Sequence, residues 1–383
     1  MKKAFSLLLA LTLLLALAAC GAAPATPAPA VTEAPAEPPA PAAAEAPTEK
    51  AGPYTVTDIL GREVAIPASV ETVAALGSAG RFIVYAGAAD KIAGLSDLEK
   101  SADPGMPFAY ANKALFAECA SVSSGGGKDT YYTEEIVMLD PDLIVLLTSD
   151  PAAADELAAQ FQKSVLAVYA RDFLDPNFTA SLRLLGSVLG TEEHAETVAA
   201  AVEGWVADLD ARTADIPEED KPTVYTGGVG FRGPHGFEGT YGAYPPFVAI
   251  HANNVVDQTG EAGAMLIDLE KVTVWDPEII FLNPSNMYIV NEDYGTNAAF
   301  YDNLSAVKNG RVYSQVTFNY FNTNMEIAIA DAYYAGCILF PEQFADVDFN
   351  ARAEEIFRAM VGMEYLSVLD ENGIGFGEIT IGA

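Results

Sequence analysis

Two stretches far apart in the chain share one pattern of hydrophobic and polar positions. Residues 134–146 read EEIVMLDPDLIVL, and residues 270–282 read EKVTVWDPEIIFL. In each, a short helix delivers an apolar residue to the core, an Asp-Pro pair ends the helix, and a buried apolar strand follows. A unit of this kind that occurs twice predicts two α/β lobes of similar build.

Between these stretches, apolar residues recur every three or four positions over residues 191–214, which predicts one long amphipathic helix. Thr191 is expected to cap its start, and Glu192 and Glu193 suit the positive end of the helix dipole. Such a helix is about 35 Å long, which is enough to bridge two lobes. A stiff connection of this kind predicts little closure when a ligand binds.

The pattern divides the chain into a first lobe over residues 53–190, the connecting helix, and a second lobe over residues 215–383. Further strands are predicted over residues 70–76, 164–169, 223–225 and 311–315. Ligands of parallel α/β sheets sit outside the carboxyl ends of the strands. We therefore expect a ligand cleft between the lobes, lined by the loops that follow these strands.

The first residues have the pattern of a targeting segment rather than of a folded element. Lys2 and Lys3 precede an almost wholly apolar run, and Leu17-Ala18-Ala19-Cys20 follows it. This ending resembles a bacterial lipobox, which predicts a signal peptide over residues 1–19 and a lipid on Cys20. A short membrane anchor and an ordinary secretory leader are the alternatives. Residues 20–52, rich in Ala, Pro and Glu, predict a flexible tether to the outside of the membrane.

Composition narrows the classes of partner. The chain has 53 acidic and 20 basic residues and a net charge of −33, so its field repels nucleic acid. Three cysteines and three histidines are too few for a disulfide framework or a typical zinc site. Cys119 and Cys337 fall in different lobes and are predicted to be unpaired, buried thiols. A receptor for free metal ions is disfavoured because it needs several converging histidines.

Several motifs together resemble a known family. They are DILGREVAIP at residues 58–67, VAAL at residues 73–76, GAADKI at residues 87–92, and the two Asp-Pro strand entries. In this order they resemble the periplasmic binding proteins of iron-complex ABC importers over residues 54–362. The resemblance implies a class III, chelatase-like fold with two α/β lobes joined by one long helix and a ligand cleft between them.

The same resemblance implies a monomeric receptor without catalytic activity or an intrinsic cofactor. It would capture an iron(III)-siderophore, haem or a corrinoid and deliver it to an ABC permease and its ATPase. YTGGVGFRGPHG at residues 225–236, YPPF at residues 244–247 and NYFNTNME at residues 319–326 resemble a branch of predicted metal-complex receptors. Family members often carry a glutamate at the position of Arg81, and that glutamate pairs with arginines of the permease. Because the residue here is an arginine, we do not expect this chain to dock in that way.

The leading candidate contacts lie in the glycine-rich loop after residue 226. Arg232 could donate paired hydrogen bonds to an anionic chelate, or it could be a surface arginine balancing nearby acids. His235 could bind the ligand or only fix its own turn. Tyr241 and Tyr244 offer flat amphipathic surface, although Tyr244 could instead brace the turn at the following prolines. The remaining candidates are Lys128, Tyr131, Tyr132, Arg171, Tyr320 and Asn322.

Two other functional classes stay open. One is a secreted enzyme on a chelatase-like fold, although the chain lacks a G-x-S-x-G elbow and an H-E-x-x-H motif. The loop before Lys128 is not a phosphate-binding Walker loop, because its glycine spacing is wrong. The other class is an adhesion or scaffolding lipoprotein. The acidic composition does not decide between these classes and a receptor.

Overall fold

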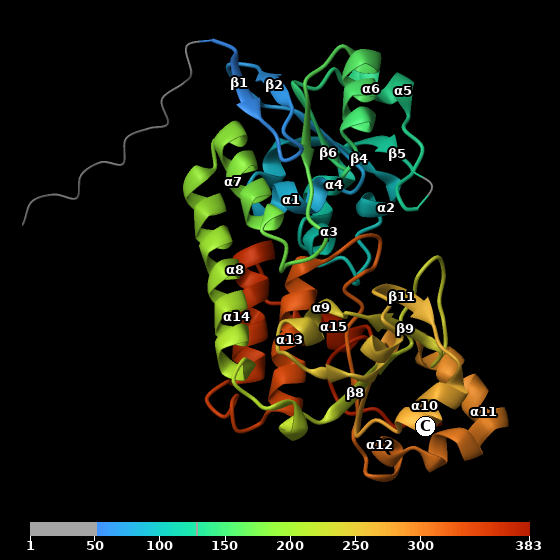
Figure 1. The fold of residues 1–383 in the computed structure, drawn as a ribbon. Helices are drawn as coiled ribbons and strands as arrows, with labels where there is room; N and C mark the ends of the chain where they lie inside the picture. The colour runs from blue at the N-terminus through green and yellow to red at the C-terminus, as the bar shows by residue number, and fades with distance from the viewer. Residues whose placement is uncertain (1–51, 128) are drawn as a thin grey trace, which may run out of the picture. The chain divides into compact units, whose positions relative to one another are not determined.

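The computed structural model describes residues 52–127 and 129–383 (Figure 1). The predicted signal peptide, the lipidation site Cys20, nearly all of the tether and the candidate contact Lys128 lie outside the described residues.

A parallel five-stranded sheet forms the centre of the first lobe, in the order β5-β4-β3-β6-β7. Its strands are β3 (Val73–Leu76), β4 (Ile92–Ser96), β5 (Ala120–Ser123), β6 (Leu143–Leu147) and β7 (Val165–Val168). Its helices are α1 (Gly80–Tyr85), α2 (Asp97–Lys100), α3 (Pro107–Ala111), α4 (Lys113–Ala117), α5 (Thr133–Leu139), α6 (Pro151–Phe161) and α7 (Asn177–Leu189). The central strands are apolar and buried throughout, as expected of a parallel sheet covered on both faces.

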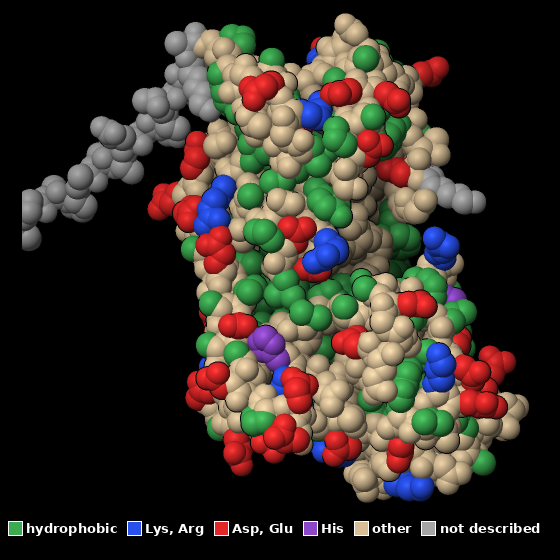
Figure 2. Space-filling model, in the orientation of Figure 1, with side chains coloured by type: hydrophobic (Ala, Val, Ile, Leu, Met, Phe, Trp, Pro, Cys, Tyr) green, Lys and Arg blue, Asp and Glu red, His purple; other side chains and the backbone are tan. Residues whose placement is uncertain are grey.

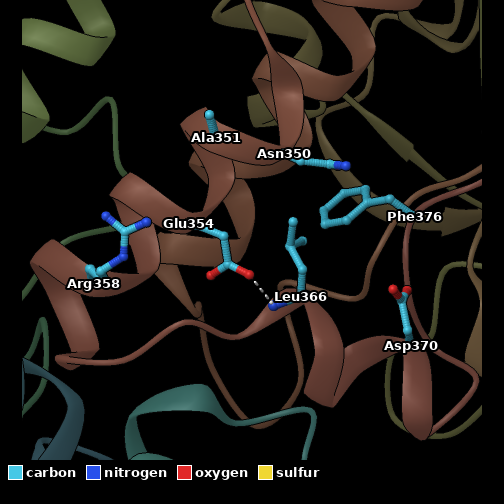
Figure 3. A pocket seen from close by; sticks show the side chains of 7 residues that line it. All are labelled: Asn350, Ala351, Glu354, Arg358, Leu366, Asp370 and Phe376. Atoms are coloured by element: carbon cyan, nitrogen blue, oxygen red, sulfur yellow. Dashed lines mark hydrogen bonds between the residues drawn. The ribbon is translucent and has the colours of Figure 1, made fainter.

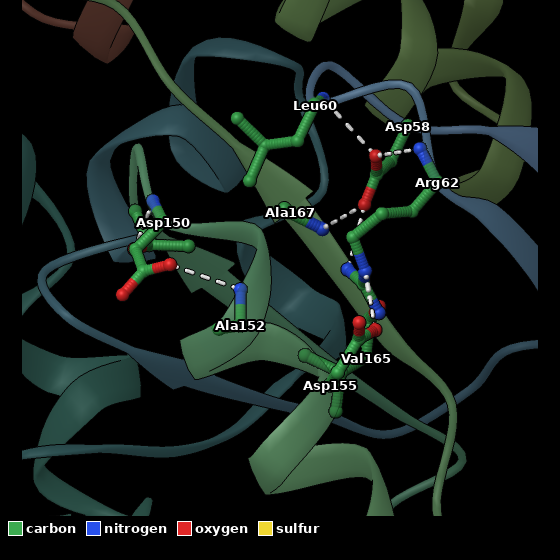
Figure 4. A network of polar contacts seen from close by, with 9 residues as sticks. Asp58, Leu60, Arg62, Asp150, Ala152, Asp155, Val165 and Ala167 are labelled. Carbon is green, nitrogen blue, oxygen red and sulfur yellow. Dashed lines mark hydrogen bonds and ion pairs between the residues drawn. The ribbon is translucent and has the colours of Figure 1, made fainter.

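An antiparallel hairpin, β1 (Tyr54–Thr57) and β2 (Glu63–Ile66), precedes this sheet and is held by Asp58 (Figure 4). The buried Asp58 carboxylate accepts hydrogen bonds from the backbone N–H of Leu60 and Arg62, and from the Arg62 guanidinium at 2.7 Å. It also accepts one from the N–H of Ala167 on β7 at 3.3 Å. Gly61 supplies the positive φ that the turn requires. The motif at residues 58–62 therefore has a structural role.

The second lobe contains a parallel sheet in the order β10-β8-β12-β13 and an antiparallel ribbon of β9 and β11. The strands are β8 (Thr223–Gly227), β9 (Gly239–Gly242), β10 (Asn253–Asn254), β11 (Gly263–Leu266), β12 (Ile279–Leu282) and β13 (Val312–Ser314). The helices are α9 (Pro245–Val248), α10 (Leu269–Trp275), α11 (Met287–Asn303), α12 (Ser305–Lys308) and α13 (Met325–Leu339).

The repeated sequence pattern gives the same local structure in both lobes. Helix α5 leads into β6, and helix α10 leads into β12. Both helices end at an aspartate in the left-handed conformation, Asp140 with φ 49° and Asp276 with φ 41°. Aspartate tolerates this conformation better than most residues, so the Asp-Pro pair ends the helix as the sequence predicts.

Helix α8 (Glu192–Thr213) connects the lobes, and the predicted fold of two α/β lobes joined by one long helix is confirmed. The predicted cap is wrong: the Thr191 hydroxyl makes no capping bond and instead donates to the backbone carbonyl of Ala86 at 2.7 Å. Helix α7 packs along α8, where Gly186 of α7 lies against Ala195 of α8. The apolar face of α8 is buried, as its period requires.

The C-terminal helices make a second connection. Helix α14 (Phe349–Val361) packs on α8 and α13, and it also contacts α1 and α3 of the first lobe (Figure 1). After α14, Tyr365 donates from its hydroxyl to the carbonyl of Pro104 at 2.9 Å, and its ring packs against that of Tyr110. Helix α15 (Leu366–Glu371) follows. The chain therefore links the lobes through α14 as well as α8.

Neither α8 nor any other helix in the described part of the chain has both the length and the apolar composition needed to cross a membrane. The two thiols are free, as predicted: Cys119 is buried, while Cys337 is only half-buried. Burial raises the pKa of Cys119 and raises that of Cys337 to about 11.

Candidate ligand-binding cleft

The surface of the molecule is hollowed between the lobes (Figure 2). Loops that follow strands of the two parallel sheets are hydrogen-bonded to each other across the lobes. Residues 319–324, which follow β13 and lead into α13, cross to the first lobe, and we call them the bridging loop. The hydroxyl of Thr323 lies 3.3 Å from the carbonyl of Arg171, and the amide of Asn324 lies 3.2 Å from that of Gly105. Each distance joins a donor of the second lobe to an acceptor of the first.

Arg81, on α1 of the first lobe, forms hydrogen bonds to the bridging loop. Its side chain is fully buried and donates to the carbonyl of Phe321 at 2.6 Å and to Oδ1 of Asn324 at 3.2 Å. Burial lowers the pKa of Arg81, while Tyr85 and the carboxylates of Glu99 and Glu326 oppose that shift. A side chain in this position is inaccessible to a permease, so Arg81 is an anchor between the lobes.

Glu326 and Tyr85 complete this contact. The Tyr85 hydroxyl donates to the carboxylate of Glu326, the second residue of α13, and both side chains are buried. Burial raises the pKa of Glu326 to about 6, although the Tyr85 hydrogen bond and Arg81 act in the opposite direction. Sequence reasoning did not select Glu326, although an acidic residue near the start of a largely apolar helix was a usable signal.

Two further predicted candidates lie in or against the bridging loop. Tyr320 is half-buried, and its hydroxyl lies 3.3 Å from Asp103 of the first lobe. Burial, followed by Asp103, raises the pKa of Tyr320. Asn322 is exposed, has φ 89°, and accepts a hydrogen bond from the N–H of Thr323. A Cβ placed on Gly126 would lie 3.7 Å from the Phe321 ring, so the first-lobe glycine loop reaches the same place.

The aromatic candidates of the second lobe form one cluster with Phe318. The Tyr241 ring packs on Tyr244 and Phe318, with centroids 5.5 and 6.2 Å apart. Tyr241 is half-buried, and its pKa is raised by burial and then by Asp172 of the first lobe. Tyr244 is only 4% exposed, and burial raises its pKa well above the usual range. Tyr241 is therefore the better placed of the two to touch a ligand.

The three basic candidates differ in their exposure to solvent and in their hydrogen-bond partners. Arg171 is exposed and hydrogen-bonded to Asp172, which raises the pKa of Arg171. Arg232 is exposed and has a positive φ of 54°. His235 is half-buried, with Nε2 2.9 Å from the carbonyl of Phe231, so it fixes its own turn.

The two first-lobe tyrosines lie beside β5. Tyr131 forms a β-bridge with Ser123, and burial followed by Asp129 raises its pKa. The Tyr132 hydroxyl donates to Asp97 at 2.8 Å, a hydrogen bond that raises the pKa of Tyr132. Both are half-buried.

A pocket of about 390 Å³ lies between α14, α15 and the C-terminal segment (Figure 3). Glu354 lines this pocket, and its carboxylate accepts hydrogen bonds from the backbone N–H groups of Tyr365 and Leu366 at 2.7 and 3.0 Å. These bonds fix the start of α15. Glu354 therefore has a structural role, and the pocket is a weaker candidate than the cleft.

The histidines are dispersed. His194 lies on α8, Nε2 of His251 lies 2.9 Å from Asp210 on the same helix, and His235 lies in the glycine-rich loop after β8. Within the described residues, no three His, Cys, Asp or Glu side chains are grouped so that they could hold a metal ion.

The comparisons with known proteins agree with this fold. A model described as periplasmic binding protein matches residues 66–315, well over half of the chain. The chain belongs to this family. It is thus a periplasmic solute-binding protein. No curated protein matches it.

Solved structures share the fold of this periplasmic binding protein at low sequence identity. A periplasmic solute binding protein from Veillonella parvula has a TM-score of 0.69 and 20% identity, covering 84% of this chain and 96% of that one. A TroA-like periplasmic binding protein, FepB, from the same species has a TM-score of 0.65 and 22% identity, covering 85% and 99%. The molybdate-bound MolA of Haemophilus influenzae has a TM-score of 0.62 and 19% identity, covering 82% and 99%.

Proposed function

We propose that this protein is the receptor of an ABC importer for a bulky metal chelate, such as an iron(III)-siderophore, haem or a corrinoid. It captures the chelate between the lobes and delivers it to a permease and its ATPase. The observation that carries the proposal is the meeting of loops from both sheets at the hollow between the lobes, with aromatic and neutral polar side chains on them.

The chemistry of these loops favours a chelate over a bare ion. The cleft offers aromatic rings and hydroxyl and amide groups, which suit a bulky organic surface. The dispersed histidines do not form a ligand set for a free ion, so the ligand would bring its own chelator.

The proposed contacts are the side chains predicted from the sequence, with exposed Arg171 and Arg232 as the positive charges. The full set is Arg232, His235, Tyr241, Tyr244, Lys128, Tyr131, Tyr132, Arg171, Tyr320 and Asn322. We further propose that the receptor acts as a monomer, performs no chemistry, and is tied to the outside of the cell membrane by a lipid on Cys20.

Equilibrium titration of the purified chain tests the proposal. Ferric siderophores, haem and cyanocobalamin are added separately, and protein fluorescence reports binding. We expect saturable binding of at least one chelate, and an affinity about tenfold lower in the double variant Arg232→Ala with His235→Ala. Arg183→Ala, which removes exposed ion pairs to Glu196 and Glu203 on α8, is the matched control. If no chelate from this panel binds, the receptor proposal is wrong.

Labelling tests the lipid separately. Cells that express the chain are fed an alkyne-tagged fatty acid, and the wild-type chain should carry the tag while Cys20→Ala should not. Equal labelling of both chains would contradict attachment at Cys20.

A further inference from the structure

A narrow recess lies at the carboxyl edge of the second-lobe sheet, next to the bridging loop. Three strands contribute to it: Thr226 lies on β8, Asn283 follows β12, and Gln315 follows β13. Its other lining residues are Val229, Tyr244, Val316, Thr317 and Asn319. The volume of about 10 Å³ has room for one water-sized group. We call these eight residues the second-lobe recess.

Gln315 supplies the recess with a buried hydrogen-bond acceptor that has no donor in the described part of the chain. It is only 2% exposed, and Oε1 has no hydrogen-bond partner among the residues that the structure describes. Its Nε2 donates to the carbonyl of Asp331 on α13 at 3.3 Å. Because a carbonyl can only accept, this contact fixes the nitrogen toward α13 and leaves the oxygen of the amide as a free acceptor. A buried acceptor without a donor is costly.

Three other polar side chains of the recess differ in whether they already have a hydrogen-bond partner. Asn283 and Asn319 donate to the carbonyls of Gly228 and Gly230 at 3.1 and 3.0 Å. The hydroxyl of Thr317 is buried and, like Gln315 Oε1, has no partner within the described range. Two oxygens of residues that line the recess are therefore available to an incoming hydrogen-bond donor.

The lack of charged side chains in the lining determines whether the incoming donor can itself carry a charge. None of the eight lining residues is Lys, Arg, His, Asp or Glu. A carboxylate or phosphate would enter without a cation to pair with. Asp331 on α13 contacts the lining and accepts a hydrogen bond from the N–H of Val316 at 3.0 Å. Burial raises the pKa of Asp331 well above the usual range, which favours its neutral form over an anion that would pair with an ammonium group. An uncharged N–H or O–H donor is the group whose burial costs least here.

We infer that the second-lobe recess binds one uncharged hydrogen-bond donor, a primary amide or a hydroxyl, on the periphery of the transported ligand. This inference rests on the proposed function. It places the ligand among chelates fringed by amides or hydroxyls rather than among those fringed by carboxylates. The body of the chelate and most of its arm stay in the cleft, and only the terminal NH₂ or OH group enters between Gln315 and Thr317, as a volume of about 10 Å³ requires.

Small probes test the recess without any assumption about the chelate. The full chain, labelled with nitrogen-15 in detergent micelles, is titrated separately with acetamide, sodium acetate and methylammonium chloride. The side-chain amide signal of Gln315 is assigned by its loss in Gln315→Met. We expect acetamide to shift this signal saturably, with binding about tenfold weaker in Thr317→Val. Gln343→Met, the same change at an exposed position, should leave the acetamide response intact.

A missing response to acetamide, or an equal response to acetate or methylammonium, would overturn the inference, because the recess would then hold a water molecule only or would not select against charge.

The second arm compares cyanocobalamin, which carries primary amides, with haem, which carries two carboxylates. We expect Gln315→Met to weaken cyanocobalamin binding about tenfold. Tight haem binding that is unaffected by Gln315→Met would also overturn the inference. If acetamide binds but no chelate does, the recess stands and the receptor proposal fails.

Discussion

At the scale of single residues, Glu326 is a buried carboxyl whose protonation state matters for the contact between the lobes. Its pKa is raised from 4.5 to about 6, chiefly by burial, so the folded state holds its proton more tightly than the unfolded state. The stability that this proton provides is full below pH 4.5 and is lost as the pH rises through about 6. The difference corresponds to about 2 kcal/mol.

Glu326→Gln tests this, because glutamine keeps an acceptor for the Tyr85 hydroxyl and does not ionise. The free energy of unfolding of the variant, relative to wild type, should rise by about 2 kcal/mol between pH 4.5 and pH 7.5. Urea denaturation at several pH values measures it. A difference that does not change with pH would show that Glu326 does not titrate in this window.

Arg81 gives a second prediction at this scale. Arg81→Met removes the donors to Phe321 and Asn324 and leaves the buried Glu99 and Glu326 without their cation. We expect a loss of about 3 kcal/mol in the free energy of unfolding. Arg183→Met, which removes exposed ion pairs to Glu196 and Glu203, should cost less than about 1 kcal/mol. Equal losses in urea denaturation would contradict the anchoring role of Arg81.

At the scale of elements, helices α7 and α8 approach each other through one glycine. A Cβ on Gly186 would lie 2.5 Å from the Cβ of Ala195, so the helices would have to separate. Gly186→Ala should therefore lower the free energy of unfolding by about 1–3 kcal/mol. Gly204, in the middle of α8, has nothing within 4 Å of the same position. Gly204→Ala should raise stability by about 0.5–1 kcal/mol.

Thermal or urea unfolding of both variants measures these opposite changes. A stabilising Gly186→Ala would show that α7 and α8 can move apart at no cost, and would weaken the view that this pair is a stiff connection.

The elements also show what a sequence can and cannot predict. The pattern around Ile136 and Val272 reports local burial, so the α/β units and the helix between them were predictable. The bridging loop was not, because its contacts join Arg81 to Phe321 and Asn324 across the whole chain. For the same reason Tyr241 and Tyr244 could not be ranked. Their burial depends on packing against Phe318, which follows β13 and is distant from both in sequence.

At the scale of the whole molecule, the two copies of the repeated unit expose matching surfaces. Glu134 on α5 and Glu270 on α10 occupy the same position in the pattern, and both are exposed. Four residues later, Met138 and Val274 are 77% and 84% exposed. Each helix thus presents an acidic side chain and an apolar one to solvent, once on each lobe.

A permease with two-fold symmetry would offer the same surface twice, and a receptor with two matching helices could contact both copies. Since buried Arg81 cannot serve in docking, α5 and α10 are the better candidates. A photo-crosslinking benzoylphenylalanine in place of Met138, or in place of Val274, should capture the same membrane protein in the native host. The double variant Glu134→Lys with Glu270→Lys should reduce that capture about tenfold through slower association, with ligand affinity unchanged.

The pair Glu219→Lys with Glu342→Lys makes an equal change in net charge at other exposed positions and should not reduce capture. It separates docking through α5 and α10 from a general effect of the strongly acidic chain, whose long-range field is screened beyond about 8 Å in physiological salt. Capture from only one of the two helices would contradict a two-sided contact, because the matching surfaces would then act independently. Equal losses in both double variants would assign the effect to net charge rather than to these helices.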